Sequence, residues 1–211
     1  DGDWNIYASW CEYGIWSLPV CVTSDTLVDQ NPSLAVDRNG RPWVAWESNR
    51  DGEWSIYVSY HDGAYWVSPV AVSTVTESHH PSMSSWFDGT GLVAVAWDGV
   101  GPEARNIFFR YYDGGQWSPE TMVSFDSVFT NENASLTAPA AGMEARVFWE
   151  HTGGANTDLR YSYTWDGVSW APPEIITTHL GLDTSPDGFG MYVPMILWFG
   201  PVWRSDRDGN N

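Results

Sequence analysis

The chain has 211 residues, with nine basic side chains, all of them Arg, against 27 carboxylates, so the formal net charge is -18. An acidic chain without any Lys excludes a nucleic acid or an anionic membrane as partner, because neutralising phosphates requires clustered cations. Its longest apolar stretches, such as residues 195–199, are far shorter than the roughly 20 residues of a membrane-spanning helix, so we expect no membrane span.

The N-terminal segment contains both cysteines. Cys11 and Cys21 lie ten residues apart on either side of the turn-like Tyr13-Gly14, a spacing that suits two neighbouring antiparallel strands. We expect a disulfide and hence an oxidising compartment, the alternative being two buried free thiols. The chain starts at Asp1 without a leader, which predicts a processed product or an excised piece.

The next segment shows the pattern that organises the whole chain. Period-two alternation rich in β-branched and aromatic residues predicts strands, and no window carries a helical stripe. Turns are expected at Asn39-Gly40, Asp51-Gly52 and Asp62-Gly63. The predicted strands of this best copy are 33–37, 42–47, 54–60 and 66–73.

Two markers then recur along the chain with a period of about 50 residues. The first is a Gly shortly before a Trp, with Pro within three residues, and Trp66 to Trp117 is 51 positions. The second is an apolar run that ends in Trp and usually an acid: Trp46-Glu47, Trp97-Asp98, Trp149-Glu150 and the weaker Trp203-Arg204. Four-stranded units of this length have the size of one propeller blade.

The two ends of the chain read as half units. Residues 3–23 supply a third and a fourth strand, and residues 191–205 supply a first and a second strand. Their pairing would close a ring, so we predict an all-β, four-bladed β-propeller with one composite blade. The alternatives are pairing of the half-blades between chains, or a chain cut from a longer array. The predicted blades are approximately 31–80, 81–133, 134–184, and 185–211 plus 1–30.

The unit at residues 31–70 resembles the sialidase-like, Asp-box type of propeller repeat, and the resemblance extends over nearly the whole chain. Asp-box turns have Ser or Thr, then Asp, Gly and an aromatic residue; here Asp62-Gly63, Asp113-Gly114 and Asp166-Gly167 place Asp directly before Gly. The resemblance implies the fold. The arginine triad, Tyr-Glu pair and Asp acid of sialidases cannot be placed on residues of this chain, so it does not imply sialidase activity.

One face of the predicted ring collects polar side chains, because the loops after the second and fourth strands of each unit emerge there. Eight Trp at the two marker positions are expected in the core between blades, whereas an irregularly placed Trp such as Trp86 is a candidate for stacking on a sugar. The alternative is a set of solvated loop ends without function. The candidate ligand-binding residues are Glu47, Arg50, His79, His80, Trp86, Asp98, Glu150, His151 and Arg204; His179 falls in the same loops.

No cofactor is expected from the sequence. The segments 37–40 and 206–211 faintly resemble calcium loops, but the first is better interpreted as a hairpin turn. No spacing of His and carboxylates is diagnostic of a metal.

The sequence favours a non-catalytic, secreted or cell-surface module that binds a glycan or an extracellular protein. A second hypothesis is a glycan-active hydrolase or lyase that uses loop carboxylates such as Glu47 and Glu150. A third is an architectural repeat protein that self-associates by strand exchange.

Overall fold

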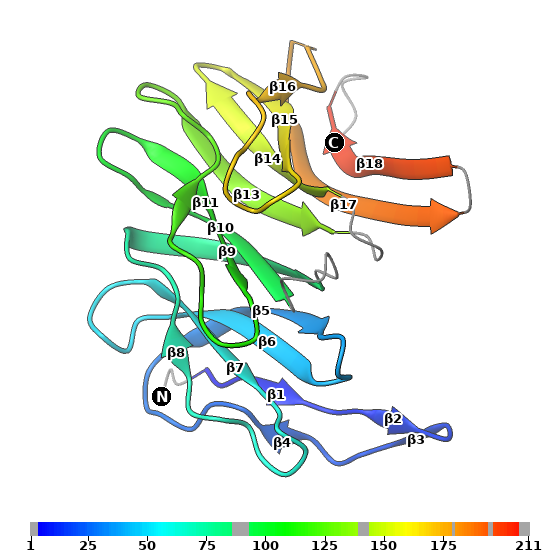
Figure 1. Cartoon of the computed structure of the whole chain (residues 1–211). Helices are drawn as coiled ribbons and strands as arrows, with labels where there is room; N and C mark the ends of the chain where they lie inside the picture. The colour runs from blue at the N-terminus through cyan, green and yellow to red at the C-terminus, as the bar shows by residue number, and fades with distance from the viewer. Residues whose placement is uncertain (1–3, 86–92, 139–143, 179, 194–195, 207–211) are drawn as a thin grey trace.

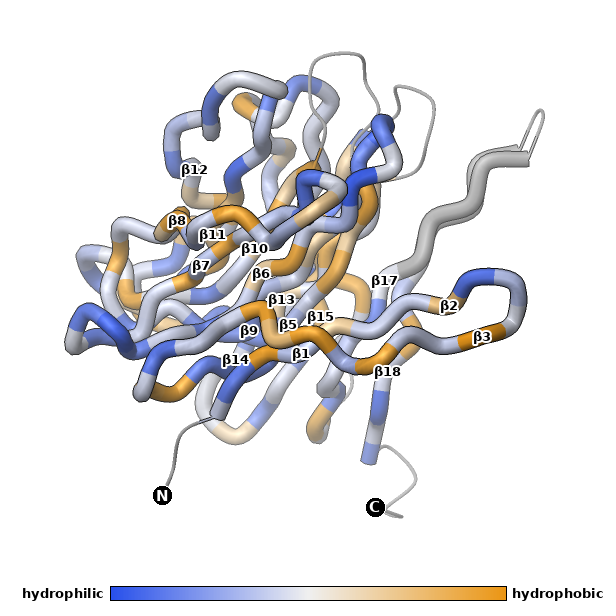
Figure 2. The backbone as a smooth tube through the Cα atoms, turned by 90° about the horizontal axis from the view of Figure 1, so that it is seen from below, coloured by the Kyte–Doolittle hydropathy of each residue, from blue (hydrophilic) through white to orange (hydrophobic). Residues whose placement is uncertain are grey.

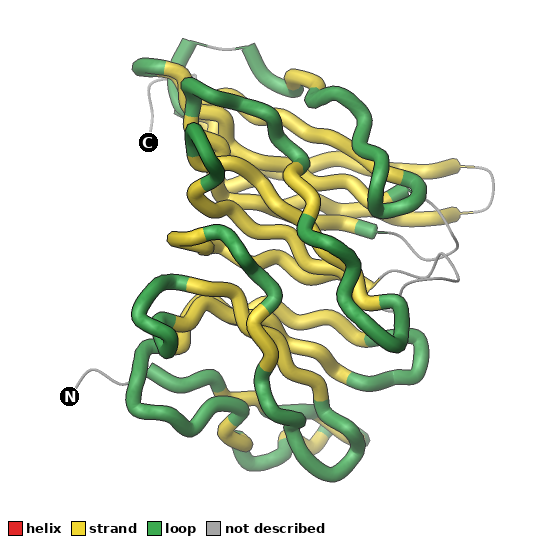
Figure 3. The backbone as a smooth tube through the Cα atoms, turned by 60° about the vertical axis from the view of Figure 1, so that its left-hand side comes forward, coloured by secondary structure: helices red, strands yellow, loops and turns green. Residues whose placement is uncertain are grey.

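The computed structural model describes residues 4–85, 93–138, 144–178, 180–193 and 196–206. In this part of the chain every regular element is a β-strand, and no described segment is helical (Figure 3). The sequence prediction of an all-β chain is confirmed. No helix that could span a membrane is found among the described residues.

Three four-stranded antiparallel sheets form the body of the molecule, and in each sheet the spatial order of the strands follows the sequence. Their first strands lie next to one another, β5 beside β9, β9 beside β13, and β13 beside β17. The first sheet contains β5 (Asp29–Val36), β6 (Pro42–Ser48), β7 (Ser55–Tyr60) and β8 (Val70–Ala71); the second contains β9 (Thr76–Ser85), β10 (Val93–Val100), β11 (Arg105–Tyr112) and β12 (Thr121–Met122); the third contains β13 (Thr130–Thr137), β14 (Ala145–Gly153), β15 (Asn156–Thr164) and β16 (Glu174–Ile175).

The two ends of the chain form separate two-stranded ribbons. At the N-terminal end β1 (Tyr7–Ala8) pairs with β4 (Val20–Cys21), and β2 (Cys11–Glu12) pairs with β3 (Ile15–Trp16). At the C-terminal end β17 (Asp183–Val193) pairs with β18 (Ile196–Ser205). The sheets follow one another in an open arc with the two ribbons at its opposite ends (Figure 1).

The expected closure of a four-bladed ring by the two termini is therefore absent from the described structure. No strand pairing joins the ribbon of β1 and β4 to the ribbon of β17 and β18 among the described residues, and no sheet closes. The internal repeat specifies four strands per unit but not the rotation between successive sheets, and it is this rotation that decides how many blades complete a circle.

The expected disulfide is also wrong, because Cys11 and Cys21 are both free and both exposed. Cys11 lies opposite Trp16 and Cys21 lies opposite Tyr7. The cysteines are thus four positions out of register along one hairpin, roughly 13 Å at a strand rise of about 3.3 Å per residue. A disulfide requires Cα atoms within about 7 Å. The exposure of both thiols excludes the alternative of buried cysteines as well.

The core lies between neighbouring sheets. Trp46, Trp97 and Trp149 are completely buried in the second strands of the three sheets. These second strands are buried on both faces, so their sequences are nearly continuous apolar runs. The fourth marker residue, Trp203, is 38% exposed and Trp16 is 69% exposed. Both belong to the end ribbons, which have a neighbouring sheet on one side only; Figure 2 shows the apolar stretches along the N-terminal ribbon.

The turns between third and fourth strands owe their shape to the Asp that the sequence places before Gly. The Asp62 carboxylate accepts the backbone N–H groups of Ala64 and Tyr65, each at 2.8 Å. Asp113 and Asp166 bond their own turns in the same way. Backbone hydrogen bonds hold the pKa of Asp166 down at about 2. The following Gly63 has φ of 110°, a conformation that other residues rarely adopt.

Serine side chains join the first strands of successive sheets. The backbone N–H of Met83 donates to Ser33 Oγ at 2.9 Å, and the N–H of Leu136 donates to Ser82 Oγ at 2.9 Å. The N–H of Gly188 donates to Ser135 Oγ at 2.8 Å. One hydroxyl at the same place in each first strand therefore fixes the next sheet.

We predict that Ser82→Ala lowers the free energy of unfolding by about 1 to 2 kcal/mol, because it leaves a buried N–H without an acceptor. Urea unfolding measures the change, and Ser68→Ala at an exposed position is the matched control. Equal midpoints for Ser82→Ala and the parent protein would show that the serine bonds between sheets add no stability.

Candidate functional site

The candidate site is built on a bulge that recurs in the first strand of each sheet. Its central residue has a left-handed backbone, with φ of 51° at Asn31, 50° at His80, 56° at Asn133 and 54° at Ser185. The strand pairing shifts register at each of these places. A left-handed non-glycine residue costs about 1 kcal/mol or more, and Asn and His tolerate it better than most residues. Something must therefore hold each bulge in place.

At three of these four bulges the partner is a carboxylate from the preceding sheet. Glu47 Oε1 accepts the backbone N–H of His80 at 2.7 Å, Asp98 Oδ1 accepts that of Asn133 at 3.0 Å, and Glu150 Oε1 accepts that of Ser185 at 2.7 Å. We call these three contacts the inter-sheet carboxylate bonds. They explain why an acid follows the buried Trp in each complete sheet.

Glu47 is saturated with hydrogen-bond donors. Besides the His80 backbone it accepts Gln30 Nε2 at 3.1 Å and Asn31 Nδ2 at 2.9 Å, and His79 Nδ1 lies 3.2 Å from Oε2. Burial acts to raise the pKa of Glu47, but these hydrogen bonds outweigh it and bring the pKa to about 2. These four contacts occupy about all the lone-pair positions of the Glu47 carboxylate, so it is held in place in its ionised form.

Asp98 is equally well occupied. Its carboxylate contacts His80 Nδ1 at 2.8 Å and Arg105 Nη1 at 2.5 Å in addition to the Asn133 backbone. The hydrogen bond to Asp98 is the main cause that raises the pKa of His80 above its ordinary value. The His80 side chain is 44% exposed, so its imidazole faces solvent at this place.

Glu150 differs from its two equivalents. Burial raises its pKa, hydrogen bonds from the Ser185 backbone and the Asn133 side chain oppose this only in part, and the charge of Glu132 raises it further. Glu132 is half-buried and lies directly opposite Glu150 in the ladder of β13 and β14. Opposed residues in an antiparallel pair have Cα atoms about 4.5 to 5.5 Å apart. The site therefore contains two adjacent acids, and the pKa of one of them, Glu150, is raised above its ordinary value.

The structure brings Glu47, His79, His80, Asp98 and Glu150 together at one end of the sheets, where the second strands end and the first strands begin. Sequence reasoning missed Glu132, Arg105 and Asn133. Each of these lies on a strand directly beside a predicted acid, so aligning the four first strands on the Asn31, His80, Asn133 and Ser185 positions would have identified Glu132 and Asn133.

The other predicted residues have different surroundings. Arg50 Nη2 bonds Asp25 and Asp29, each at 2.9 Å, and its guanidinium carbon lies 4.3 Å from the centre of the Tyr57 ring. His151 is buried with Nδ1 3.0 Å from Asn131 Oδ1, and burial lowers its pKa. Arg204 is exposed on β18, one sheet beyond Glu150. Trp86 and His179 lie outside the described residues.

The described residues contain no group of three or more His, Cys, Asp or Glu arranged to hold a metal ion. The carboxylate of Asp37 accepts the backbone N–H groups of Asn39 and Arg41, together with Arg41 Nε and Trp43 Nε1. Segment 37–40 is therefore the hairpin turn that the sequence indicates, with Asp37 as its internal acceptor.

Comparison with known proteins places this geometry in a structural context. No protein-family model matches the sequence, and no curated protein matches it significantly. The solved structures that are similar include an α-L-arabinanase of Penicillium chrysogenum complexed with arabinobiose, with a TM-score of 0.59 and 13% identity, covering 85% of this chain and 63% of that one. A PL25 ulvan lyase matches with a TM-score of 0.56 and 16% identity, covering 83% of this chain and 49% of that one. A subtype N10 neuraminidase-like protein of A/little yellow-shouldered bat/Guatemala matches with a TM-score of 0.55 and 12% identity, covering 77% of this chain and 48% of that one.

The chain has a β-propeller type of fold. It spans less than two thirds of the length of these neighbours, and at such identities the likeness concerns the fold. The neighbours do correct one expectation from the sequence, which favoured a non-catalytic module over an enzyme. The arabinanase and the ulvan lyase are glycan-active enzymes.

The carboxylate of Glu47 makes acid stability testable. Its ionised form is stabilised, so its contribution is complete above about pH 4.5 and is lost as the pH falls toward 2. We predict that Glu47→Gln costs about 2 to 3 kcal/mol at pH 5.5, where the pKa difference between the folded and unfolded states takes full effect. The cost becomes smaller as the pH is lowered.

His79 sets the upper limit of this window. The hydrogen bond to Glu47 raises the pKa of His79, so its contribution is complete below pH 6.5 and declines as the pH rises through the raised pKa. Urea unfolding of the parent protein and of Glu47→Gln between pH 3 and 8 measures both effects, with exposed Glu53→Gln as control. A cost of Glu47→Gln that is independent of pH would contradict the assignment.

Proposed function

We propose that the protein is a glycan-active enzyme that hydrolyses a glycosidic bond, with Glu150 as general acid and Glu132 as its carboxylate partner. The observation that supports this most is the opposed pair itself, in which burial raises the pKa of Glu150 beside a second, more accessible acid. Two neighbouring acids whose surroundings separate their pKa values are the usual basis of acid and base roles. The glycan-active structural neighbours agree with this reaction class.

In the proposed reaction Glu150 gives its proton to the glycosidic oxygen as the bond from that oxygen to the anomeric carbon breaks. Glu132 attacks the anomeric carbon and forms a glycosyl-enzyme, which a water molecule then hydrolyses while Glu150 takes up the proton that the water loses. This is the retaining reaction that closely spaced carboxyl groups carry out. His80 and Asn133 border the pair and are in position to orient the sugar hydroxyls. The inter-sheet carboxylate bond to Ser185 fixes Glu150 relative to the next sheet.

The charges around the pair favour an uncharged substrate. Glu47, Asp98, Glu132 and Glu150 gather here, whereas Arg105 is engaged by Asp98 and His79 by Glu47. A uronate or sialate would meet an excess of carboxylates, because the His80 imidazole is itself bonded to Asp98. We therefore propose a neutral glycan as substrate. An extracellular location and an extracellular protein partner remain proposals that follow from such a substrate, and calcium binding remains an untested prediction.

Reducing-end release from a panel of neutral polysaccharides tests the proposal. We predict that Glu150→Gln and Glu132→Gln each lower the rate at least about 100-fold, the usual contribution of one acid or base. Glu53→Gln is the matched control on an exposed loop. Circular dichroism verifies that the variants fold. Activity that survives both site variants, or a parent protein that cleaves no neutral glycan, would reject the assignment.

Self-association through the edge strands also remains a prediction. In the described structure β18 and β1 each have one unpaired side, and unpaired strand edges favour pairing with another chain. We expect the average mass from light scattering to rise with concentration, and Tyr7→Lys on β1 to suppress the rise. A constant monomer mass across a dilution series would exclude strand exchange.

A further inference from the structure

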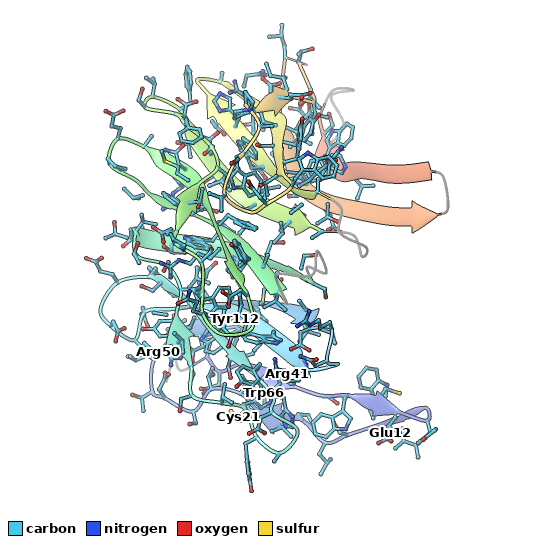
Figure 4. The ribbon with its side chains drawn as sticks, viewed as in Figure 1. Glu12, Cys21, Arg41, Arg50, Trp66 and Tyr112 are labelled. Atoms are coloured by element: carbon cyan, nitrogen blue, oxygen red, sulfur yellow. The ribbon has the colours of Figure 1, made fainter. Side chains whose placement is uncertain are left out.

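A strip of aromatic side chains lies at the opposite end of the sheets from the acids. Trp43 stands near the start of β6 and Glu47 near its end, so the two are separated by roughly 13 Å along the strand. Figure 4 shows Tyr112, Arg41 and Trp66 in succession along this part of the molecule. We call the strip formed by Trp10, Trp43, Tyr60, Trp66, Tyr112 and Trp117 the aromatic track.

The rings of the track are in contact across two sheet boundaries. Within the first sheet the ring centre of Trp43 lies 4.5 Å from that of Tyr60, and across the boundary to the second sheet it lies 5.0 Å from that of Tyr112. His61 lies 5.5 Å from Trp66 within the first sheet, and across the boundary to the N-terminal ribbon it lies 6.4 Å from Trp10. Tyr60 and His61 are consecutive, so their side chains point to opposite faces of the first sheet, and the two groups lie one on each side of that sheet.

Each group encloses a cavity. One of about 190 Å³ is lined by Trp43, Tyr60, Tyr112 and Trp117, with Gln116 at its side. The other, of about 330 Å³, is lined by Trp10, Pro42, His61, Gly63 and Trp66. Both are several times larger than the roughly 30 Å³ that a water molecule occupies. They combine ring surfaces with a few polar groups, which is the usual composition of a ligand site.

The two cavities occupy equivalent places in the repeat. Tyr60 O accepts the N–H of Val67 at 3.0 Å, and Trp10 O accepts the N–H of Ser17 at 2.8 Å. The preceding serines, Ser59 and Ser9, donate their hydroxyls to those same partner residues. Tyr60 and Trp10 therefore correspond to each other in successive units. The same kind of cavity thus occurs twice, on successive units, and a ligand made of repeating units could occupy both.

The charges at the rim limit the chemistry of such a ligand. Asp62 and Asp113 border the track, and backbone hydrogen bonds lower the pKa of each, so both stay negative. Among the described residues Arg41 stacks on the track, 4.9 Å from the Tyr60 ring centre, and it is paired with Asp37 at 2.7 Å. A polyanionic chain is repelled here, whereas an uncharged sugar ring can place its C–H face on rings that are at least partly exposed, such as Trp10, Trp66 and Trp117; Trp43 itself is buried.

We propose that the aromatic track binds a neutral linear polysaccharide at a site separate from the acids. The inference shares with the proposed function only the uncharged nature of the glycan. Binding at the track requires no proton transfer and is independent of Glu132 and Glu150. It holds a polymer on the protein while the other end of the sheets carries the acids.

Affinity electrophoresis in gels containing linear arabinan, xylan or mixed-linkage glucan tests this proposal, with polygalacturonate as the charged polymer. We expect retardation by at least one neutral polymer and none by polygalacturonate. Trp10→Ala, at a side chain that is 51% exposed, should weaken binding about tenfold, as loss of one stacking contact predicts. Tyr112→Phe should bind like the parent protein because it keeps the ring, and Tyr112→Ala should not.

Trp165→Ala is the matched control, an exposed Trp on the third sheet. Equal retardation of Trp10→Ala, Tyr112→Ala and the parent protein, or no retardation by any neutral polymer, overturns the proposal. The Glu150→Gln variant separates this test from that of the proposed function. If it binds like the parent protein but cleaves nothing, both assignments stand. If the parent protein cleaves no glycan while binding depends on Trp10, only the proposed function fails.

Discussion

The inter-sheet carboxylate bond is the interaction on which the arrangement of this protein depends. A first strand that bulges into a left-handed residue exposes an N–H group that the β-ladder does not use, at a cost of about 1 kcal/mol or more in backbone strain. The acid that follows the buried Trp of the preceding sheet accepts this N–H at His80, Asn133 and Ser185. In each second strand, the Trp that packs in the core is followed directly by the acid that accepts the N–H group of the next bulge. This arrangement accounts for the recurrent Trp-acid pair.

The same constraint places charged groups where chemistry can develop. Three equivalent carboxylates lie at one end of the sheets, but they do not have equal numbers of donors. Glu47 and Asp98 are surrounded by donors and act as anchors, whereas Glu150 faces the like charge of Glu132. Two of the three equivalent carboxylates, Glu47 and Asp98, therefore serve to hold the sheets together. The third, Glu150, has a raised pKa. The aromatic track lies at the opposite end of the sheets, so the two proposed sites are spatially separate.

The sequence predicted what depends on local pattern. The period of about 50 residues located the strands and their order, and Asp-Gly pairs marked the turns, because alternation and left-handed glycines are local properties. Ring closure was not confirmed in the described residues, because it depends on the rotation between sheets, which no short motif encodes. The disulfide was wrong because a ten-residue spacing allows several registers, and the one adopted sets Cys11 and Cys21 four positions apart. Glu132 was missed because its partner Glu150 lies across the ladder, 18 residues away.

Amide hydrogen exchange at His80, Asn133 and Ser185 tests the inter-sheet carboxylate bonds most directly. These N–H groups lie at bulges, next to solvent, and have carboxylates as their acceptors. The account predicts slow exchange at all three amides in the parent protein and selective acceleration at His80 in Glu47→Gln, with Asn133 and Ser185 unchanged. Exchange in the parent protein as fast as in the exposed turn at Gly114 would contradict it.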